Sequence, residues 1–458
     1  MEHFDAAIIG FGTAGRALGA ALADAGQSVA VVEQSDKMYG GACVNVACIP
    51  TKALVHAARM SAEAGGSIEE HEQRYTAAVD NMDLLRTTSR ERNYRSLADR
   101  PNVQVVNGTA TFASRNRLHV STASGLFDIE ADRIFIDTGS TPKKPDIPGA
   151  DSPRAYTSDE LIDVRVMPLQ LVVIGGGYVG LEFASMYADF GAEVTLLQRG
   201  PRILPDEDPE TARAVQDSLT ARGIQVFCNA DVRSIDDEHD QVLVIARIDG
   251  EEKRLPGHGA LLATGRTPNT ASLGLDAAGI ELDEGGGIAV DEHLRTSAPN
   301  VWAMGDVTGG AQFTYLAYDD FRIVASDVLG DGSRTTENRG TVPHCTFVHP
   351  PFARIGITAQ EARAAGFSTN VYTLPASRIS QAAILQDETG LMKAVVDANS
   401  GLVLGMDLFC EDAQELVNLV KIVMDARIPA SVLRTAVFSH PSMTEAFNNL
   451  FSESPVQD

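Results

Sequence analysis

The order of apolar and polar positions repeats within the first two thirds of the chain. Residues 6–26 and 171–191 each contain an apolar strand rich in β-branched residues, then a glycine loop, then an alanine-rich helix that ends at a glycine. A second apolar strand follows in each copy, beginning at Ser28 and at Glu193. Because this order of elements builds a parallel sheet, each copy predicts a βαβ unit.

Later strands extend the similarity between the two copies. The runs 135–140 and 261–266 both carry a strand into a Thr-Gly pair, Thr138–Gly139 and Thr264–Gly265, and a proline-rich linker follows each. We therefore predict a second nucleotide-binding domain inserted into a first one. The expected boundaries are 1–145 for the start of the first domain, 146–266 for the inserted domain, 267–338 for the returning segment and 339–458 for a C-terminal domain.

The last third of the chain has a different pattern. The segments 370–376 and 392–409 predict antiparallel strands, and the second segment turns back on itself at Asn399–Gly401. An amphipathic helix is expected near 411–427, and no nucleotide-binding motif occurs in this region. The expected fold class is therefore α/β, with two Rossmann-like domains and a C-terminal α+β domain that offers a surface for dimerisation.

Charge and length exclude several classes of partner. The formal net charge of −25 opposes binding to nucleic acid phosphates and to anionic membrane surfaces. No continuous apolar run approaches the roughly 18 residues that span a bilayer. The N-terminal segment lacks the basic region and cleavage site of a secretory signal. We therefore expect a cytoplasmic protein with neither a nucleic acid nor a membrane as partner.

The first glycine loop predicts a dinucleotide site. Gly10, Gly12 and Gly15 have the G-x-G-x-x-G spacing, which lets a pyrophosphate approach the backbone at a helix N-terminus. Glu33 ends the next strand 18 residues after Gly15, where a carboxylate accepts hydrogen bonds from ribose hydroxyls. The simpler alternative is a tight turn followed by a surface glutamate.

The second glycine loop predicts another nucleotide site with a different preference. Gly175, Gly177 and Gly180 repeat the spacing, but the next strand ends in Gln198–Arg199 instead of an acidic residue. A neutral residue followed by a cation tolerates the 2′-phosphate that a carboxylate repels, so the sequence favours NADPH. The alternative is that Arg199 is a solvated surface residue and that the protein uses NADH or both nucleotides.

The segment 40–52, GGACVNVACIPTK, predicts redox chemistry. On a regular helix, Cys43 and Cys48 would lie ~140° apart, so a local disulfide requires a distorted backbone. A helix N-terminus lowers the pKa of a thiol and stabilises the reactive thiolate. A zinc site is the rival interpretation, although no second cysteine pair has suitable spacing, and two inert buried thiols are the simplest one. The other cysteines are expected to be buried as small apolar residues: Cys228, Cys345 and Cys410.

A histidine near the C-terminus is a candidate acid and base. Glu445 follows His440 by five residues, and a carboxylate that orients an imidazole gives a suitable proton partner for a thiol. A single histidine near a chain end is more often structural. The pattern by itself is therefore weak.

Together these motifs resemble the class I pyridine-nucleotide–disulfide oxidoreductases, which include glutathione reductase, dihydrolipoamide dehydrogenase and mercuric reductase. The resemblance covers essentially the whole chain, and GGACVNVACIPTK is its most specific part. It implies FAD as cofactor, NADPH or NADH as reductant, and a homodimer. Cys43 resembles the interchange thiol, and Cys48 resembles the charge-transfer thiol beside the flavin. Lys52 resembles the lysine near flavin N5, and Glu182 its ion-pair partner.

The resemblance also implies roles outside the redox segment. Tyr178 is similar to the tyrosine that gates the nicotinamide pocket, and Asp306 to the aspartate on the FAD ribityl chain. His440 and Glu445 resemble the family's dyad, which acts across the dimer interface. The Thr-Gly turns are expected beside the two nucleotides, and their residues are Thr138 and Gly139 for FAD and Gly265 for NAD(P).

Departures from the family pattern leave the electron acceptor open. Ala42 and Ala47 stand where the family usually has threonine and glycine, which affects the geometry or potential of the disulfide. Three stretches are most similar to a bacterial branch with copper(II) reductase activity and a role in reactive-chlorine resistance. The alternatives are a disulfide reductase or dihydrolipoamide dehydrogenase, a mercuric reductase, or a flavin-binding redox sensor. No resident metal is predicted, although three neighbouring residues are candidate soft ligands: His344, Cys345 and His349.

Overall fold

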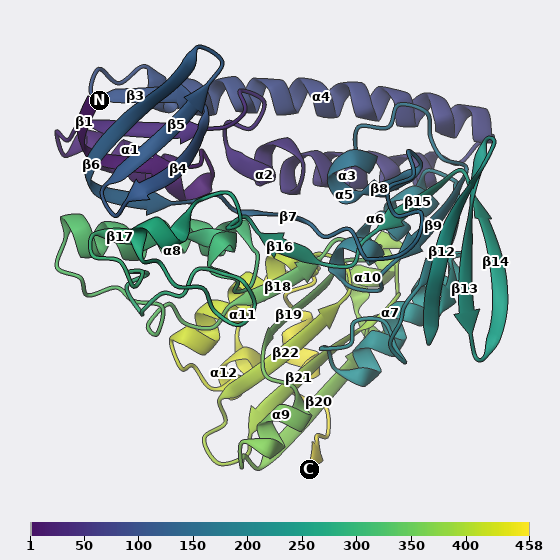
Figure 1. Cartoon of the computed structure of the whole chain (residues 1–458). Helices are drawn as coiled ribbons and strands as arrows, with labels where there is room; N and C mark the ends of the chain where they lie inside the picture. The colour runs from purple at the N-terminus through teal and green to yellow at the C-terminus, as the bar shows by residue number, and fades with distance from the viewer. Residues whose placement is uncertain (1, 458) are drawn as a thin grey trace.

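The N-terminal part of the chain forms a seven-stranded sheet in the computed structural model, which describes residues 2–457 (Figure 1). Its strand order is β3-β2-β1-β6-β5-β4, and β17 pairs with β6. The strands are β1 (Glu2–Ile9), β2 (Val29–Glu33), β3 (Val103–Asn107), β4 (Thr109–Ser114), β5 (Arg117–Thr122), β6 (Gly125–Ile136) and β17 (Val301–Ala303). The pairs among β1, β2, β3, β6 and β17 are parallel, so the chain returns to the first sheet at β17.

The middle of the chain builds a second parallel sheet in the order β11-β10-β9-β15-β8, with an antiparallel β12-β13-β14 sheet beside it (Figure 1). The strands of both are β8 (Ala155–Thr157), β9 (Gln170–Ile174), β10 (Glu193–Leu197), β11 (Gln225–Phe227), β12 (Ala230–Glu238), β13 (Gln241–Ile248), β14 (Glu251–Gly257) and β15 (Gly259–Leu262). The short antiparallel pair β7 (Ser140–Pro142) and β16 (Arg266–Pro268) connects the two regions. Both predicted βαβ units are confirmed.

The C-terminal region is a six-stranded sheet in the order β18-β19-β22-β21-β20-β23. Its strands are β18 (Pro343–Thr346), β19 (Phe352–Gly356), β20 (Thr369–Pro375), β21 (Leu391–Asp397), β22 (Val403–Phe409) and β23 (Val456–Gln457). The predicted antiparallel strands are confirmed, because β20, β21 and β22 pair antiparallel. The amphipathic helix is α11 (Ala413–Asp425), whose apolar face is buried against β19 and β22.

The helices cover these sheets and the junctions between them (Figure 1). Those of the nucleotide-binding regions are α1 (Thr13–Asp24), α2 (Gly41–Asn45), α3 (Cys48–Ala64), α4 (Ile68–Ala98), α5 (Ser158–Leu161), α6 (Tyr178–Asp189), α7 (Pro209–Ala221) and α8 (Thr314–Leu329). Those of the C-terminal region, besides α11, are α9 (Ala359–Ala364), α10 (Ser380–Leu385), α12 (Ala430–Thr435) and α13 (Ala446–Leu450).

One helical stretch, residues 41–64, is long and apolar enough to cross a membrane by length and composition alone. The expectation that no continuous apolar run approaches ~18 residues is not contradicted, because polar residues such as Asn45, Lys52 and Arg59 interrupt this stretch. A core helix has the same composition, and α3 packs against α4 and α6. The stretch is also interrupted between α2 and α3, at Val46 and Ala47, and it carries Lys52 in an ion pair with α6.

The core joins the three regions. One cluster of buried side chains contains Leu54 of α3, Tyr75 of α4, Phe183 of α6 and the pair Phe352 and Phe409 of the C-terminal sheet. Burial of such large apolar side chains fixes the elements that carry them, because each contributes about 1.5–3 kcal/mol. The helix α3, which begins at Cys48, is therefore packed against both other regions.

Candidate active site

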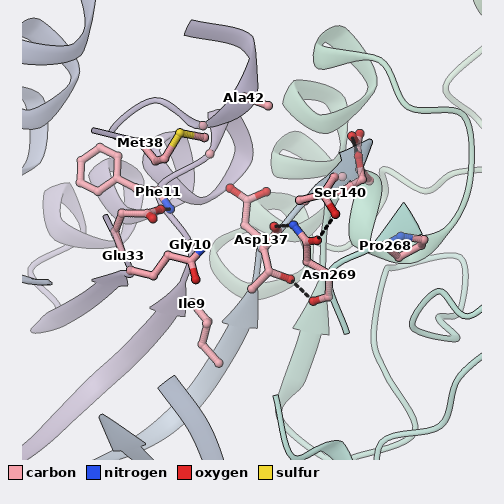
Figure 2. Close-up of a pocket in the computed structure, with 18 of the residues that line it drawn as sticks. Ile9, Gly10, Phe11, Glu33, Met38, Ala42, Asp137, Ser140, Pro268 and Asn269 are labelled. Atoms are coloured by element: carbon pink, nitrogen blue, oxygen red, sulfur yellow. Dashed lines mark hydrogen bonds between the residues drawn. The ribbon is translucent and has the colours of Figure 1, made fainter. Parts of the chain in front are cut away.

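A cavity of about 480 Å³ opens at the carboxyl ends of β1, β2 and β6 (Figure 2). It lies where parallel sheets with this topology bind nucleotides. The structure brings together many of the residues predicted from the sequence. Those that line the cavity are Gly10, Gly12, Glu33, Cys43, Thr138, Gly139 and Asp306.

Glycine is required in the first loop because Asp137, the residue directly after β6, lies very close to the loop backbone. A Cβ atom on Gly10, whose φ is +106°, would lie 2.2 Å from the carbonyl oxygen of Asp137, and one on Gly12 would lie 2.5 Å from its carboxylate. Side chains are therefore excluded, and the N-terminus of α1 is left open to the cavity. Gly15 does not line the cavity, and its N–H instead donates to Asp137 Oδ2 at 2.7 Å.

Asp137 is a site residue that the sequence did not single out. Burial raises its pKa to about 8, and the nearby carboxylates of Asp306, Asp320 and Glu33 act in the same direction. The hydrogen bond from Gly15 opposes this shift. A usable signal was the position of Asp137 directly before the Thr-Gly turn, where the second copy has alanine.

Two further carboxylates face the cavity from fixed positions. Glu33 Oε2 accepts from Phe11 N at 3.0 Å, and burial raises the pKa of Glu33 against these backbone hydrogen bonds. Asp306 Oδ2 accepts from the Ser140 hydroxyl at 2.6 Å, and Ser140 accepts from Arg266 Nε at 2.8 Å. A glycine-lined cradle at a helix N-terminus with a braced carboxylate at the end of β2 fits an adenine dinucleotide.

The two redox cysteines lie on either side of the break between α2 and α3. Cys43 is in α2, Cys48 begins α3, and Ala47 between them has φ −131° and ψ −110°. Both cysteines are free thiols here and are hydrogen-bonded to each other. The backbone between them is therefore distorted in the way that a local disulfide with this five-residue spacing requires.

The pKa values of the two thiols are shifted in opposite directions. The hydrogen bond from Cys43 lowers the pKa of Cys48 to about 6; Thr314 and the charge of Lys52 also lower it, and burial opposes them. Thr314 Oγ1 lies 3.2 Å from Cys48 Sγ. The same thiol–thiol contact and burial raise the pKa of Cys43. Cys48 is thus the stabilised thiolate, and Thr314 is a contact that sequence reasoning missed.

A buried ion pair joins the two copies beside this dithiol. Lys52 Nζ lies 2.6 Å from Glu182 Oε1, and Glu182 Oε2 accepts from Phe347 N at 3.3 Å. Lys52 also lies 4.8 Å from the centroid of the Phe347 ring. Burial works against the charge of Lys52, but Glu182 more than offsets it and raises the pKa of the lysine. Phe347 was not predicted from the sequence.

The second glycine loop has the same backbone constraint. A Cβ atom on Gly175, whose φ is +123°, would lie 2.2 Å from the Ala263 carbonyl oxygen, and one on Gly180 would lie 1.9 Å from that of Gly175. Gly177 and Gly265 have no heavy atom within 4 Å of that position, so they leave open space.

The end of the following strand carries the two residues predicted to select the nucleotide. Gln198 Oε1 accepts from Gly176 N at 3.1 Å, and Arg199 is exposed. Arg202, three residues further on, donates to backbone carbonyls of its own loop, at Pro205 and Glu207.

Tyr178, at the start of α6, is held by a network that reaches the C-terminal sheet. Its hydroxyl donates to Glu207 and lies 3.4 Å from His344 Nδ1. Glu207 Oε2 accepts from Arg354 Nη1 at 2.9 Å. Burial raises the pKa of Tyr178, and the Glu207 carboxylate adds to the effect. Glu207 and Arg354 lack a local sequence signal, because the network joins segments about 150 positions apart.

His440 and Glu445 are paired as predicted, with His440 Nδ1 2.7 Å from Glu445 Oε2. The His440 side chain is 67% exposed, and neither residue lines the cavity of its own chain. The dyad is therefore assembled within one chain but lies away from the Cys43 and Cys48 dithiol of that chain.

The candidate soft metal ligands are not brought together. His344 packs on Phe313, with ring centroids 5.1 Å apart, while His349 faces Asp189 and Asp387. Neighbouring residues of a strand point to opposite faces, which separates Cys345 from His344. Among residues 2–457, these three do not form a candidate metal cluster.

The expectation for the other cysteines was correct only for Cys410, which is fully buried. Cys228 and Cys345 are only partly buried. Each lies at the edge of a hydrophobic cluster, where its apolar neighbours cover one side of the thiol. Burial and Glu182 raise the pKa of Cys345 to about 12, so it is a neutral thiol.

Comparison with known proteins decides the family. Residues 4–320 match the pyridine nucleotide-disulphide oxidoreductase family, and residues 342–451 match its dimerisation domain. The chain belongs to this family. Its members are FAD-dependent oxidoreductases of pyridine nucleotides, so the resemblance drawn from the sequence, the fold class and the enzymatic nature of the chain are confirmed.

Several family members are similar over nearly the whole chain. A probable pyridine nucleotide-disulfide oxidoreductase, RclA of Escherichia coli strain K12, is 42% identical over 99% of both chains. A dihydrolipoyl dehydrogenase of Mycobacterium tuberculosis is 31% identical over 98% of both, and a mercuric reductase of Bacillus cereus is 31% identical over 96% of this chain and 70% of that one. A solved structure described as the Cu(II) complex of HOCl-induced flavoprotein disulfide reductase RclA from Escherichia coli superposes with a TM-score of 0.93, at 42% identity over 99% of both chains.

Proposed function

We propose that this oxidoreductase takes electrons from NADPH and passes them through Cys43 and Cys48 to copper(II) or a related oxidant, in the cytoplasm and in defence against oxidative stress. The observation that carries the proposal is the lowered pKa of one thiol of the pair. Thr314 and Lys52 stabilise a thiolate on Cys48. The similarity to a flavoprotein solved with Cu(II) supports copper as the acceptor.

The first loop supplies the residues for the flavin. Gly10, Gly12, Glu33, Thr138, Gly139 and Asp306 would hold FAD, and Gly15 would act through Asp137. When bound, FAD supplies a group that accepts hydride and releases electrons to the dithiol. Lys52, held by Glu182, keeps a positive charge beside Cys48, which favours the thiolate.

The second loop supplies the residues for the reductant. Gly175, Gly177, Gly180 and Gly265 would hold the nucleotide, with open space beside Gly177 and Gly265, and Tyr178 would cover the nicotinamide end. The absence of an acidic side chain at Gln198, together with the exposed Arg199, supports NADPH over NADH. We also propose that the domain boundaries are those predicted from the sequence, at 145, 266 and 338.

The dithiol supplies the electrons for the acceptor. Because Cys48 is already a thiolate, formation of the Cys43–Cys48 disulfide breaks only the Cys43 S–H bond, releases its one proton to solvent and yields two electrons. Two electrons reduce two Cu(II) ions to two Cu(I) ions. NADPH would supply the two electrons that reopen the disulfide, and Cys43 would take up one proton while Cys48 returns to the thiolate.

A disulfide acceptor is the second candidate, because the His440–Glu445 pair is intact. In thiol–disulfide exchange, Cys43 gives up its S–H proton as its sulfur attacks one substrate sulfur, and the other sulfur leaves as a thiolate that takes up a proton. An imidazole oriented by a carboxylate supplies that proton near neutral pH. The exposed position of His440 suits a homodimer in which this dyad serves the dithiol of the partner subunit.

An anaerobic titration with NADPH, and separately with NADH, tests the electron route. The long-wavelength absorbance of a thiolate beside oxidised flavin should persist in Cys43→Ser and disappear in Cys48→Ser, while Cys228→Ser behaves as the parent. Persistence in Cys48→Ser would overturn the assignment of the two thiols. The NADPH-reduced parent is then offered copper(II), mercury(II), glutathione disulfide and lipoamide in parallel. The acceptor with the highest kcat/KM separates the candidates, and a higher value for either disulfide than for copper(II) would contradict the leading proposal.

A further inference from the structure

A second group of ligand-bearing side chains lies outside the residues of the redox site. His349 follows β18, Asp387 follows α10, and Glu411 follows β22, so three separate turns converge there. One ligand atom from each lies within 4.8 Å of the other two. None of these residues has a role in the proposed electron route.

The imidazole of His349 faces a carboxylate on each side without a hydrogen bond to either. Its Nε2 lies 3.7 Å from Asp387 Oδ2, and its Nδ1 lies 3.6 Å from Asp189 Oδ2. Both separations exceed the range of an N–H···O hydrogen bond. Nδ1 is also buried and has no hydrogen-bond partner of any kind. A buried polar atom without a partner is costly, which favours a small shift that lets Nδ1–H donate to Asp189 and leaves the Nε2 lone pair on the side of Asp387.

The spacing suits a metal ion. Two ligands at ~2.1 Å from a tetrahedral zinc ion lie about 3.4 Å from each other, which is close to the 3.7 Å between His349 Nε2 and Asp387 Oδ2. A small adjustment of the side chains therefore places both atoms on one ion. An N and O donor set without sulfur suits zinc and related divalent cations.

Each of the three side chains has a neighbour that holds one of its polar atoms and leaves another available to bind a cation. Asp387 Oδ1 accepts from Thr389 N at 3.0 Å, and Glu411 Oε1 accepts from Arg59 Nη2 at 2.5 Å. Asp189 faces Nδ1 of the histidine, in the carboxylate–histidine arrangement that orients metal-binding imidazoles. Asp387 Oδ2, Glu411 Oε2 and His349 Nε2 remain available for an ion.

The charges near the group favour a cation. Three carboxylates, Asp189, Asp387 and Glu411, face two guanidinium groups, Arg59 and Arg222. Arg59 also pairs with a fourth carboxylate, Glu63, 3.4 Å away. The four carboxylates outnumber the two guanidinium groups, so the group has an excess of negative charge. The His349 side chain is 23% exposed and that of Glu411 8%, so the group is sheltered but reachable from solvent.

We propose that His349, Asp387 and Glu411 form a binding site for a divalent cation of the zinc class. The ligands are His349 Nε2 and one oxygen from each carboxylate, with water at the fourth position. Asp189 is a positioning residue that accepts a hydrogen bond from Nδ1–H. The bound cation ties the turn after β18 to the turns after α10 and β22, and it is separate from the electron acceptor.

The test uses the full-length FAD-loaded protein with Cys43→Ser and Cys48→Ser, so that the dithiol cannot bind the metal. Titration with zinc sulfate by calorimetry, with metal analysis after gel filtration, should give one zinc per chain. His349→Ala should lower the affinity about 100-fold or more, and Asp189→Asn about 10- to 100-fold. His56→Ala, which removes an exposed histidine of α3, is the matched control and should bind as the parent does.

Two results would overturn the site. One is a parent protein that retains no zinc after gel filtration, and the other is His349→Ala with the affinity of His56→Ala. Flavin content and circular dichroism establish that each variant is folded. If His349→Ala fails to fold, Asp387→Asn, which preserves the size of the side chain, takes its place, and unchanged zinc affinity in that variant contradicts the proposal equally.

Discussion

The two glycine loops share a backbone but differ in charge. The nearest obstacle to a side chain is the same in both, because a Cβ atom on Gly10 or on Gly175 would lie 2.2 Å from the carbonyl oxygen of the residue before the Thr-Gly turn. That residue is Asp137 in the first copy and Ala263 in the second. Steric constraints therefore fix the two loops alike, while the side chains around them are free to diverge.

The residues at the ends of β2 and β10 also share a structural contact but differ in charge. Glu33 accepts a hydrogen bond from Phe11 N, and Gln198 accepts one from Gly176 N, at equivalent places in the two loops. Both side chains brace the loop, but only Glu33 brings a negative charge. The bracing of the loop and the choice of nucleotide are therefore separate effects of this side chain. Each can be tested by placing the residue of one copy at the equivalent position of the other.

The largest effect is expected for alanine at the constrained glycines. Gly10→Ala and Gly175→Ala each place a Cβ atom against a carbonyl oxygen at positive φ, which should cost about 3 kcal/mol or more. Gly10→Ala should lose bound flavin, whereas Gly175→Ala should keep flavin and lose turnover with NADPH. Flavin absorbance and thermal denaturation measure both. Gly177→Ala, which has open space, is the control for stability, and equal destabilisation by all three would contradict the steric argument.

A negative charge introduced at the end of β10 should have the next largest effect, on the choice between NADPH and NADH. Gln198→Glu introduces a carboxylate that repels a 2′-phosphate, so kcat/KM for NADPH should fall ~10- to 100-fold, or about 1.4–2.7 kcal/mol. The value for NADH should stay within a few-fold of the parent. Steady-state kinetics with both nucleotides measure this, and an equal loss with both would show that Gln198 only braces the loop.

Asp137→Asn should change how stability depends on pH. Burial raises the pKa of Asp137 to about 8, so between pH 4 and 8 the folded chain binds a proton that the unfolded chain has lost. Stability therefore falls as the pH rises through this window, by at least about 1.4 kcal/mol, the equivalent of one pKa unit. Asparagine should flatten this part of the profile of melting temperature between pH 5 and 9.

The reciprocal change in the second copy is the control for this effect. Ala263→Asp places a carboxylate at the equivalent position and should steepen the same profile. An Asp137→Asn profile parallel to that of the parent would show that the carboxylate is ionised in the folded protein at all of these pH values.

The smallest effect is expected at Arg199. Because this side chain is exposed, a contact with a 2′-phosphate is worth about 0.2–1 kcal/mol, so Arg199→Ala should raise the KM for NADPH up to ~5-fold. The kcat and the kinetics with NADH should not change, and added salt should reduce the difference. A similar rise for both nucleotides would remove Arg199 from nucleotide selection.

Features that depend on local order were accessible from the sequence. The two βαβ units follow from periodicity and glycine spacing, and the pairing of His440 with Glu445 follows from five residues of separation. The ion pair between Lys52 and Glu182 spans 130 positions and was anticipated only through resemblance to a family.

The contacts that were missed depend on packing between distant segments. Thr314 reaches Cys48 from α8, and Glu207 joins Tyr178 to Arg354 from the C-terminal sheet. No periodicity or spacing reports such a contact, because each partner is an ordinary residue within its own segment. His344, Cys345 and His349, which the sequence offered as candidate ligands, are likewise not brought together, because neighbouring strand residues point to opposite faces and His349 lies beyond β18.

The ion pair between Lys52 and Glu182 also restricts how the two copies can evolve. Glu182 lies on the helix after the second glycine loop, yet its carboxylate supports the lysine beside the first copy's dithiol. After a duplication, either copy would ordinarily be free to accumulate substitutions. Here a substitution that rotates or shortens α6 would disturb two sites at once: the second glycine loop, which α6 follows, and the position of Lys52 beside Cys48.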